Sequence, residues 1–100
     1  MNYRRLGRTG LEISEISLGT WQVGGGWGGS FDRKIADEII QTALDHGVNF
    51  LDTADVYDDQ QSERAVADFV RKDRDKVYIA TKIGRRLNPH TADAYTPEAL

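Results

Sequence analysis

Apolar runs of strand length alternate with amphipathic segments of helix length along most of this sequence. Extended runs are expected at 16–21, 48–52 and 76–83, each rich in apolar residues. Residues 33–46 and the segment that starts at Ser62 instead repeat apolar residues at helical spacing. Strands that are apolar on both faces and separated by helices, in units of about thirty residues, predict a parallel sheet covered by helices.

A β-hairpin is expected before the first of these strands. Residues 3–6 and 11–14 are short extended pieces, and the glycine-bracketed polar segment 7–10 between them is typical of a turn. The glycine-rich segment 24–29 is predicted to be a loop, because ordering so many glycines in a helix or strand is entropically costly. It lacks the spacing of a dinucleotide-binding fingerprint and is expected to cover the mouth of a pocket, with Trp27 as one candidate wall.

Capping residues predict where the helices begin and end. Asp32 is expected to be the N-cap of the first helix, Gly47 its C′ glycine, and Ser62 the N-cap of the second helix. The apolar residues expected to face the core are Ile35, Ala36, Ile39, Ile40, Ala43 and Leu44 in the first helix and Ala65, Val66, Phe69 and Val70 in the second. A third helix is expected to begin at Thr96. We therefore expect residues 1–100 to be the N-terminal part of one longer domain, unable to close a core alone.

Polar residues with matched chemistry stand at the ends of two successive strands. The apolar run at 48–51 leads directly into Asp52, and a carboxylate at the end of a buried strand is costly unless a cation or hydrogen bonds meet it. Lys82 stands at the end of the next predicted strand, and Tyr57 follows Asp52 by five positions. We expect the three side chains to gather at one rim of the sheet.

This rim also bears on the fold class. An open doubly wound sheet and a closed barrel both fit the periodicity of the sequence. Functional residues at the ends of several successive strands favour the barrel, because the rim of a barrel is built from every strand.

The expected trio suits general acid catalysis. A phenol is a poor proton donor at neutral pH, and a neighbouring ammonium makes it a better acid by favouring the phenolate. Asp52 would keep Lys82 charged and oriented, and Lys82 would make Tyr57 the better acid. Protonation of an oxygen that gains negative charge, as in carbonyl reduction, needs such a group. The structural alternatives are a buried Asp52–Lys82 ion pair without chemistry and a packed Tyr57 with a satisfied hydroxyl.

Charge and composition argue against several other functions. A net charge of −3 and a pI near 5.3 do not suit nucleic-acid binding, and the pair Arg85 and Arg86 is expected to be solvated rather than bound to an anion. The absence of cysteine excludes disulfides, and the acids near Asp52 miss the spacing of a calcium loop, so no metal is expected. Without a long apolar run or a leader-like start, no membrane association is expected and the cytoplasm is the default location.

Five stretches, in order and over nearly the whole chain, resemble the aldo-keto reductases: 5–11, 18–21, 50–57, 62–63 and 80–82. The resemblance implies an α/β fold, the (β/α)8 TIM barrel with an N-terminal β-hairpin that closes its bottom. Only the hairpin and the first three βα units would lie in this chain. It further implies NADP-dependent reduction of an aldehyde or ketone to an alcohol, or the reverse, on a small-molecule substrate.

The resemblance also assigns roles to individual residues. Tyr57 corresponds to the proton donor, Lys82 to the residue that makes the donor a stronger acid, and Asp52 to the partner of Lys82. Gly19, Thr20 and Trp21 correspond to the segment beside the nicotinamide half of NADP(H), and Asp52 also lies close to that half.

Two features depart from the family pattern. A glycine commonly follows the tyrosine in the family, whereas Asp58 follows here. The resemblance places the family's catalytic histidine at the end of the fourth strand, beyond residue 100, and neither His46 nor His90 stands in that position. A regulatory or sensor subunit with bound cofactor, similar to the potassium-channel beta subunits, is kept as the alternative to an enzyme. Oligomeric state stays open.

Overall fold

A two-stranded hairpin opens the chain in this computed structural model, which describes residues 1–25 and 30–99. Strands β1 (Tyr3–Arg5) and β2 (Glu12–Ser14) pair antiparallel, with Tyr3 opposite Ser14. The 3-10 turn η1 (Gly7–Thr9) connects them, and Gly10 follows it at a φ of 76° that favours glycine. The predicted hairpin is therefore confirmed, with strands one residue shorter at the turn.

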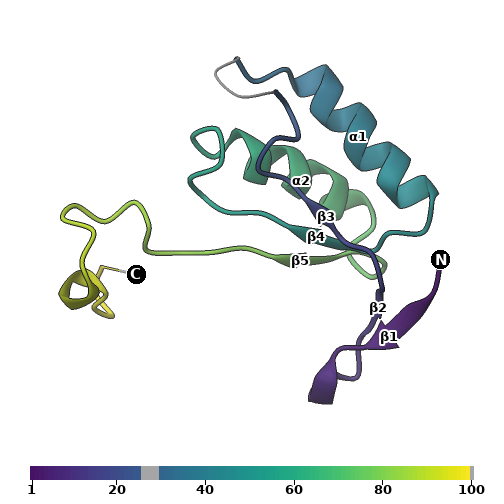
Figure 1. Cartoon of the computed structure of the whole chain (residues 1–100), viewed down its shortest axis with the longest axis horizontal. Helices are drawn as coiled ribbons and strands as arrows, with labels where there is room; N and C mark the ends of the chain where they lie inside the picture. Colours follow the sequence, from purple (N-terminus) through teal and green to yellow (C-terminus); the bar gives the residue numbers. More distant parts are fainter. Residues whose placement is uncertain (26–29, 100) are drawn as a thin grey trace.

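Three parallel strands form a second sheet. β3 (Leu18–Gly19), β4 (Phe50–Asp52) and β5 (Tyr78–Ala80) lie in the order β3-β4-β5, so each strand pairs with its neighbour in the sequence (Figure 1). The register sets Gly19 opposite Asp52 and Asp52 opposite Ala80, which aligns the carboxyl ends of all three strands. The parallel sheet is as predicted.

All three parallel strands are shorter than the sequence pattern predicts. The predicted runs 16–21, 48–52 and 76–83 extend beyond β3, β4 and β5, because only the residues of these three strands pair with a neighbouring strand in this sheet. Ile16 and Ile83, at the outer ends of those runs, are 63% and 62% exposed. Apolar composition alone therefore predicted strand residues that do not pair with a neighbouring strand.

Two helices cover one face of the parallel sheet (Figure 1). α1 (Arg33–Asp45) connects β3 to β4, and α2 (Gln61–Lys72) connects β4 to β5. The buried apolar core that they form with the sheet consists of Val23, Ala36, Ile40, Val48, Leu51, Ala65, Val66 and Val77. This is the βαβαβ arrangement that the alternating pattern predicts.

The apolar face of α1 is only partly buried. Ala36 and Ile40 are fully buried, and Ala43 and Leu44 pack against the core. Ile35 and Ile39, which were also predicted to face inward, are 46% and 37% exposed. The apolar stripe of α1 is wider than the contact that the sheet and α2 provide in the described part of the chain.

The ends of α1 are as predicted. Asp32 caps the helix, because its Oδ1 accepts hydrogen bonds from the backbone N–H groups of Lys34 at 3.0 Å and Ile35 at 3.3 Å. Gly47 follows the C-cap residue His46 with a φ of 91°, and its N–H donates to the Leu44 carbonyl at 3.0 Å. Local capping signals were sufficient to place this helix.

The predicted N-cap of α2 is wrong. Ser62 lies inside the helix, fully buried, and α2 begins at Gln61. The N-cap position is Gln60, which has a φ of 71° and makes no side-chain capping bond. Asp58 and Asp59 before it also have positive φ values, of 46° and 52°, so the loop turns into the helix two residues earlier than the serine predicts. The expected inward residues of α2 are nonetheless buried or half-buried.

The hairpin docks at the amino ends of the parallel strands. Asn49, directly before β4, accepts a hydrogen bond from Ser14 N–H at 2.7 Å and donates from Nδ2 to the Glu12 carbonyl at 2.9 Å. The Tyr3 hydroxyl donates to the Gly47 carbonyl at 2.7 Å. Since Asp52 ends the same strand that Asn49 precedes, the hairpin and the predicted rim lie at opposite ends of the sheet.

The chain after β5 is mostly irregular. It contains one short 3-10 turn, η2 (Ala92–Ala94), and folds back so that the ring of Tyr95 packs against Gly84. Residues 97–99 form a turn in which Ala99 N–H bonds to Thr96, where a third helix was predicted to begin. Trp27 and most of the glycine-rich loop lie outside the described residues. In the part of the chain that is described, no helix combines the length and apolarity needed to cross a bilayer.

Candidate active site

Lys82 and Asp52 meet at the carboxyl ends of β4 and β5. Lys82 Nζ lies 3.3 Å from Asp52 Oδ1 and 3.2 Å from Oδ2, and it donates to the Thr53 carbonyl at 2.9 Å. Lys82 follows β5 by two residues rather than lying within the strand as predicted. The side chains of Lys82 and Asp52 are 49% and 43% exposed, so the pair is accessible to solvent and is not the buried ion pair of the structural alternative.

Tyr57 completes the predicted trio. Lys82 Nζ donates to the Tyr57 hydroxyl at 3.2 Å and lies 5.1 Å from the centre of its ring. The hydroxyl of Tyr57 first, and the carboxylate of Asp52 after it, raise the pKa of Lys82 and outweigh the desolvation that lowers it. Because the ammonium is the donor in this bond, the hydroxyl proton of Tyr57 is free for another acceptor.

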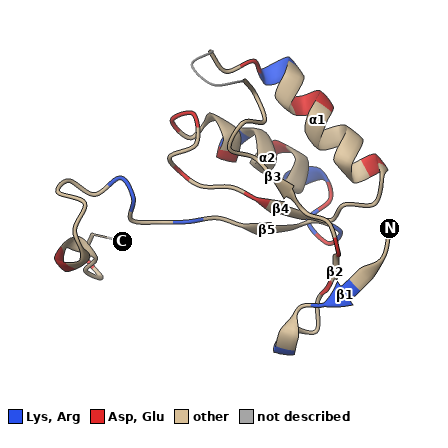
Figure 2. Cartoon of the chain, viewed as in Figure 1, with Lys and Arg blue, Asp and Glu red and all other residues tan. Residues whose placement is uncertain are grey.

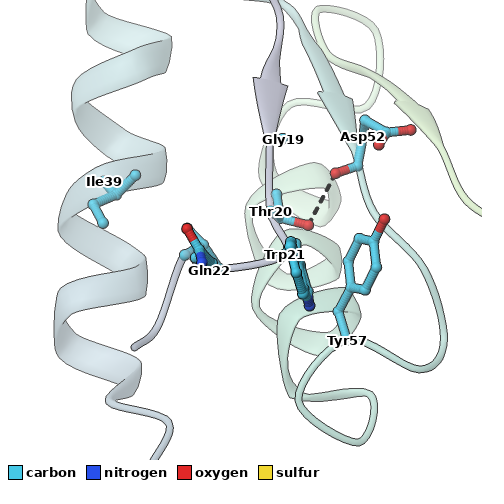
Figure 3. Close-up of a pocket in the computed structure, with 8 residues that line it drawn as sticks. Gly19, Thr20, Trp21, Gln22, Ile39, Asp52 and Tyr57 are labelled. Atoms are coloured by element: carbon cyan, nitrogen blue, oxygen red, sulfur yellow. Dashed lines mark hydrogen bonds between the residues drawn. The ribbon is translucent and has the colours of Figure 1, made fainter. Parts of the chain in front are cut away.

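Thr20 holds the backbone at Asp52. Its N–H and its hydroxyl both donate to the Asp52 carbonyl oxygen, at 2.9 and 3.0 Å, and the residue is fully buried (Figure 3). The threonine hydroxyl is therefore occupied inside the protein, and Thr20 contributes to the site by fixing the end of β4 beside β3.

A pocket of about 300 Å³ opens beside this arrangement. Figure 3 shows Trp21 and Tyr57 on one side of it and Ile39 of α1 on the other. A Cβ added at Gly19 would meet no atom within 4 Å, so the backbone there borders open space. The residues that line the pocket are Gly19, Thr20, Trp21, Gln22, Val23, Ile39, Asp52 and Tyr57. All four residues expected beside a nicotinamide, Gly19, Thr20, Trp21 and Asp52, are among them.

Sequence reasoning missed part of the pocket wall. Gln22 and Val23 directly follow the predicted segment and could have been included by position. Nothing in the sequence indicated that Ile39 would border the pocket, because an isoleucine at helical spacing from other apolar residues is expected to lie in the core. Only the tertiary structure shows that its side chain borders the pocket.

Arg86 was expected to be solvated, and its side chain is 46% exposed, but the structure shows that it is also bonded within the protein. Its guanidinium donates to the Asp55 carbonyl at 3.0 Å and to Asp59 Oδ1 at 2.8 Å. A second contact between the same two segments is the hydrogen bond from Thr81 Oγ1 to Glu63 Oε1 at 2.6 Å. The segment after β5 is thus joined at several points to the loop and helix that follow β4.

Neither histidine belongs to this site. His46 Nδ1 is paired with the Thr42 carbonyl in α1, and His90 Nε2 with the Tyr95 hydroxyl. Among the described residues, no three or more histidine, cysteine, aspartate and glutamate side chains come together as a group that could hold a metal ion.

Comparisons with known proteins identify the family to which the chain is similar. The model of the Aldo/keto reductase family matches residues 15–99. Aldo-keto reductase YhdN of Bacillus subtilis is 43% identical over 84 residues, which cover 82% of this chain and 25% of that protein. A probable voltage-gated potassium channel subunit beta of Arabidopsis thaliana is 38% identical over 83% of this chain and 25% of its own length. The NADH-specific methylglyoxal reductase of Escherichia coli is 40% identical, over 79% of this chain and 25% of its own length.

Comparison with solved structures also finds aldo-keto reductases. The holo form of an aldo-keto reductase from Bacillus halodurans superposes with a TM-score of 0.75 at 32% identity, over 92% of this chain and 29% of that one. An aldo-keto reductase from Klebsiella pneumoniae in complex with NADPH superposes with a TM-score of 0.61 at 30% identity, over 74% of this chain and 25% of that one. This chain spans about a quarter of the length of the curated relatives named above. With a family match over residues 15–99 and a fold shared with these reductases, the chain belongs to the aldo/keto reductase family.

Proposed function

We propose that this chain carries the proton-donating side of a carbonyl reductase that uses NADP(H). The observation that carries the proposal is the position of Lys82 Nζ, which lies 3.2 Å from both the Tyr57 hydroxyl and Asp52 Oδ2. An acid, its activating cation and the partner of that cation therefore meet beside a pocket that is open to solvent.

The side chains in this trio divide the work of proton transfer. The Tyr57 hydroxyl would give its proton to the carbonyl oxygen of an aldehyde or ketone as that oxygen gains negative charge. Lys82, donating to the same hydroxyl, would stabilise the phenolate that remains. Asp52 would keep Lys82 cationic and aimed at Tyr57. In the direction of alcohol oxidation, the Tyr57 oxygen would accept the proton.

The residues around the pocket fit the nicotinamide end of a dinucleotide. The space above Gly19 is open, and Trp21 offers an aromatic face beside it. When bound, the reduced cofactor supplies the hydride that the carbonyl carbon accepts. Gly19, Thr20, Trp21 and Asp52 are the residues that would line its nicotinamide side. The NADPH complex of the Klebsiella relative supports NADP(H), and the name of the Escherichia coli relative makes NADH the comparison to include in any assay.

We also propose that residues 1–100 form the N-terminal part of a single (β/α)8 barrel domain. Three parallel strands in sequence order, a hairpin at their amino ends and the trio at their carboxyl ends support this assignment. In such barrels, active sites lie at the carboxyl ends of the strands.

The test compares the full-length protein with its Tyr57→Phe variant, using the loss of NADPH absorbance in the presence of a panel of aldehydes and ketones. We expect kcat to fall by about 100-fold or more in the variant, because general acids contribute roughly that much. Cofactor affinity, measured by calorimetry, should stay unchanged. Tyr95→Phe is the matched control, since its hydroxyl is bonded to His90 outside the pocket. A Tyr57→Phe variant that keeps the wild-type rate would contradict the proposal.

The regulatory alternative has weaker support. The Arabidopsis relative shows that this family includes a probable channel subunit, but at lower identity than the Bacillus subtilis reductase. No feature of the described residues favours that role over reduction. The regulatory role would be favoured if the wild type and the Tyr57→Phe variant both bind NADPH tightly and neither turns over.

A further inference from the structure

Arg86 connects the two loops that carry the proposed acid and its activating lysine. It stands four residues after Lys82, and it donates from Nη1 to the Asp55 carbonyl and from Nη2 to Asp59 Oδ1. Asp55 and Asp59 lie two residues before and two residues after Tyr57. The two Arg86 bonds therefore hold the loop on both sides of the proposed proton donor.

The backbone hydrogen bonds of Tyr57 itself are long. Tyr57 N–H reaches the Ala54 carbonyl at 3.3 Å, and Ser62 N–H reaches the Tyr57 carbonyl at 3.5 Å, both at the long end of the hydrogen-bond range. Immediately after Tyr57, residues 58–60 all adopt positive φ values without a glycine among them. Such residues persist in the left-handed region only where their surroundings hold them there.

Figure 2 shows that the charges of these segments are complementary. The acidic loop between β4 and α2 and the basic residues after β5 lie on the same side of the molecule, at the carboxyl ends of the strands. Thr81, next to Lys82, also bonds to Glu63 in the first turn of α2. The segment that presents Arg86 is thus itself anchored beside the loop that Arg86 holds.

We propose that Arg86 is a positioning residue for the reaction described above, which keeps the Tyr57 hydroxyl within reach of Lys82 Nζ. The inference rests on the proposed function of Tyr57. The side chains of Arg86 and Asp59 are 46% and 84% exposed, so their ion pair contributes little to global stability. The bond to the Asp55 carbonyl does not depend on that exposed carboxylate, and its effect is local to the loop.

Binding of an anionic ligand is the competing role for Arg86. Both terminal nitrogens of its guanidinium are already engaged by acceptors within the protein. An anion would have to compete with an acidic loop for them. The bonds in the structure therefore favour positioning over ligand binding.

The experiment uses the full-length protein and its Arg86→Ala, Arg86→Lys and Arg85→Ala variants. Arg85 is the matched control, because the described residues offer it no hydrogen bond or ion pair. For Arg86→Ala we expect kcat to fall by about tenfold or more, since a misplacement of about 1 Å at a reacting group can cost about 100-fold. Cofactor affinity should be unchanged. Hydrogen exchange of the peptide spanning 54–61 should become faster.

Arg86→Lys should restore part of kcat, because a lysine keeps the charge but cannot donate from two fixed nitrogens. Arg85→Ala should match the wild type in both kcat and hydrogen exchange. Unchanged hydrogen exchange in Arg86→Ala would overturn the proposal whether or not the enzyme turns over. So would a weaker cofactor affinity with kcat unchanged, which would identify Arg86 as a ligand contact. Normal kcat in Arg86→Ala, with kcat lost in Tyr57→Phe, would overturn the positioning role and leave the proposed function intact.

Discussion

The ammonium group of Lys82 has four acceptors within reach and three protons to share among them. Two are the carboxylate oxygens of Asp52, the third is the Thr53 carbonyl and the fourth is the Tyr57 hydroxyl. The Tyr57 hydroxyl first, and the carboxylate of Asp52 after it, favour the charged form, which is why the pKa of Lys82 is raised. At the scale of single residues, this arrangement orients a cation toward Tyr57 while leaving about half of the lysine side chain exposed.

The raised pKa of Lys82 predicts a pH dependence of stability. A lysine whose pKa is higher in the folded protein stabilises the fold below its ordinary pKa of 10.5, and this contribution is lost as the pH rises through the folded value. We expect Lys82→Met to lower the free energy of unfolding at neutral pH by less than about 1 kcal/mol, because solvent screens the half-exposed pair. The difference from wild type should shrink at pH values above 10.5.

Denaturant titrations at neutral and alkaline pH measure this difference. Lys34→Met is the control, since Lys34 Nζ has no hydrogen-bond or ion-pair partner in the described part of the chain. An equal loss of stability at both pH values in Lys82→Met would show that packing, rather than charge, is the source of the effect.

The loop between β4 and α2 shows how one element accommodates a departure from the family pattern. The resemblance places a glycine after the tyrosine, and the position is occupied here by Asp58 with a φ of 46°. Glycine adopts this conformation without a steric penalty, and aspartate is one of the few other residues that tolerate it. The path of the loop is thus compatible with the substitution, at some cost in backbone strain.

Replacing Asp58 with alanine and replacing it with glycine should therefore change the stability of the protein in opposite directions. Its side chain makes no hydrogen bond or ion pair in the described part of the chain, so replacing it changes mainly the backbone energy. We expect Asp58→Ala to be less stable than Asp58→Gly by about 1 kcal/mol, because alanine is penalised in the left-handed region and glycine is not. Wild type should lie between the two. Equal midpoints of chemical denaturation for the two variants would show that φ at this position does not control stability.

Asn49 links the two sheets at the scale of the whole molecule. It stands at the start of β4 and satisfies backbone groups of β2 with both ends of its side-chain amide. Ser14, whose N–H it accepts, is buried. Together with the bond from the Tyr3 hydroxyl to the Gly47 carbonyl, Asn49 thus holds the hairpin at the end of the parallel sheet opposite the candidate active site.

Replacing Asn49 should loosen the hairpin without touching the site. We expect Asn49→Ala to lower the free energy of unfolding by about 1–3 kcal/mol, because it leaves the buried Ser14 N–H without its acceptor. Hydrogen exchange of the Ser14 amide should become faster. Asn2→Ala is the control, since only its backbone bonds to the hairpin. Unchanged exchange at Ser14 would mean that other contacts suffice to hold the hairpin.

Local signals in the sequence determined much of this protein. Asp32 and Gly47 act only on neighbouring backbone groups, so the ends of α1 could be predicted without knowledge of the rest of the chain. The alternation of strands and helices predicted the parallel sheet, and the order of Asp52, Tyr57 and Lys82 along it predicted that the three side chains meet. These features depend on short-range geometry and on the common direction of neighbouring strands.

Tertiary structure decided what depends on partners distant in the sequence. The lengths of the strands follow from how many of their residues find a partner in a neighbouring strand, and the exposure of Ile39 follows from what α1 packs against. The start of α2 was set by the loop before it rather than by Ser62. Arg86 could not be assigned from sequence, because its acceptors, Asp55 and Asp59, come close only when β4 and β5 pair. A capping bond lies within one turn of chain, whereas these contacts exist only after the chain has folded.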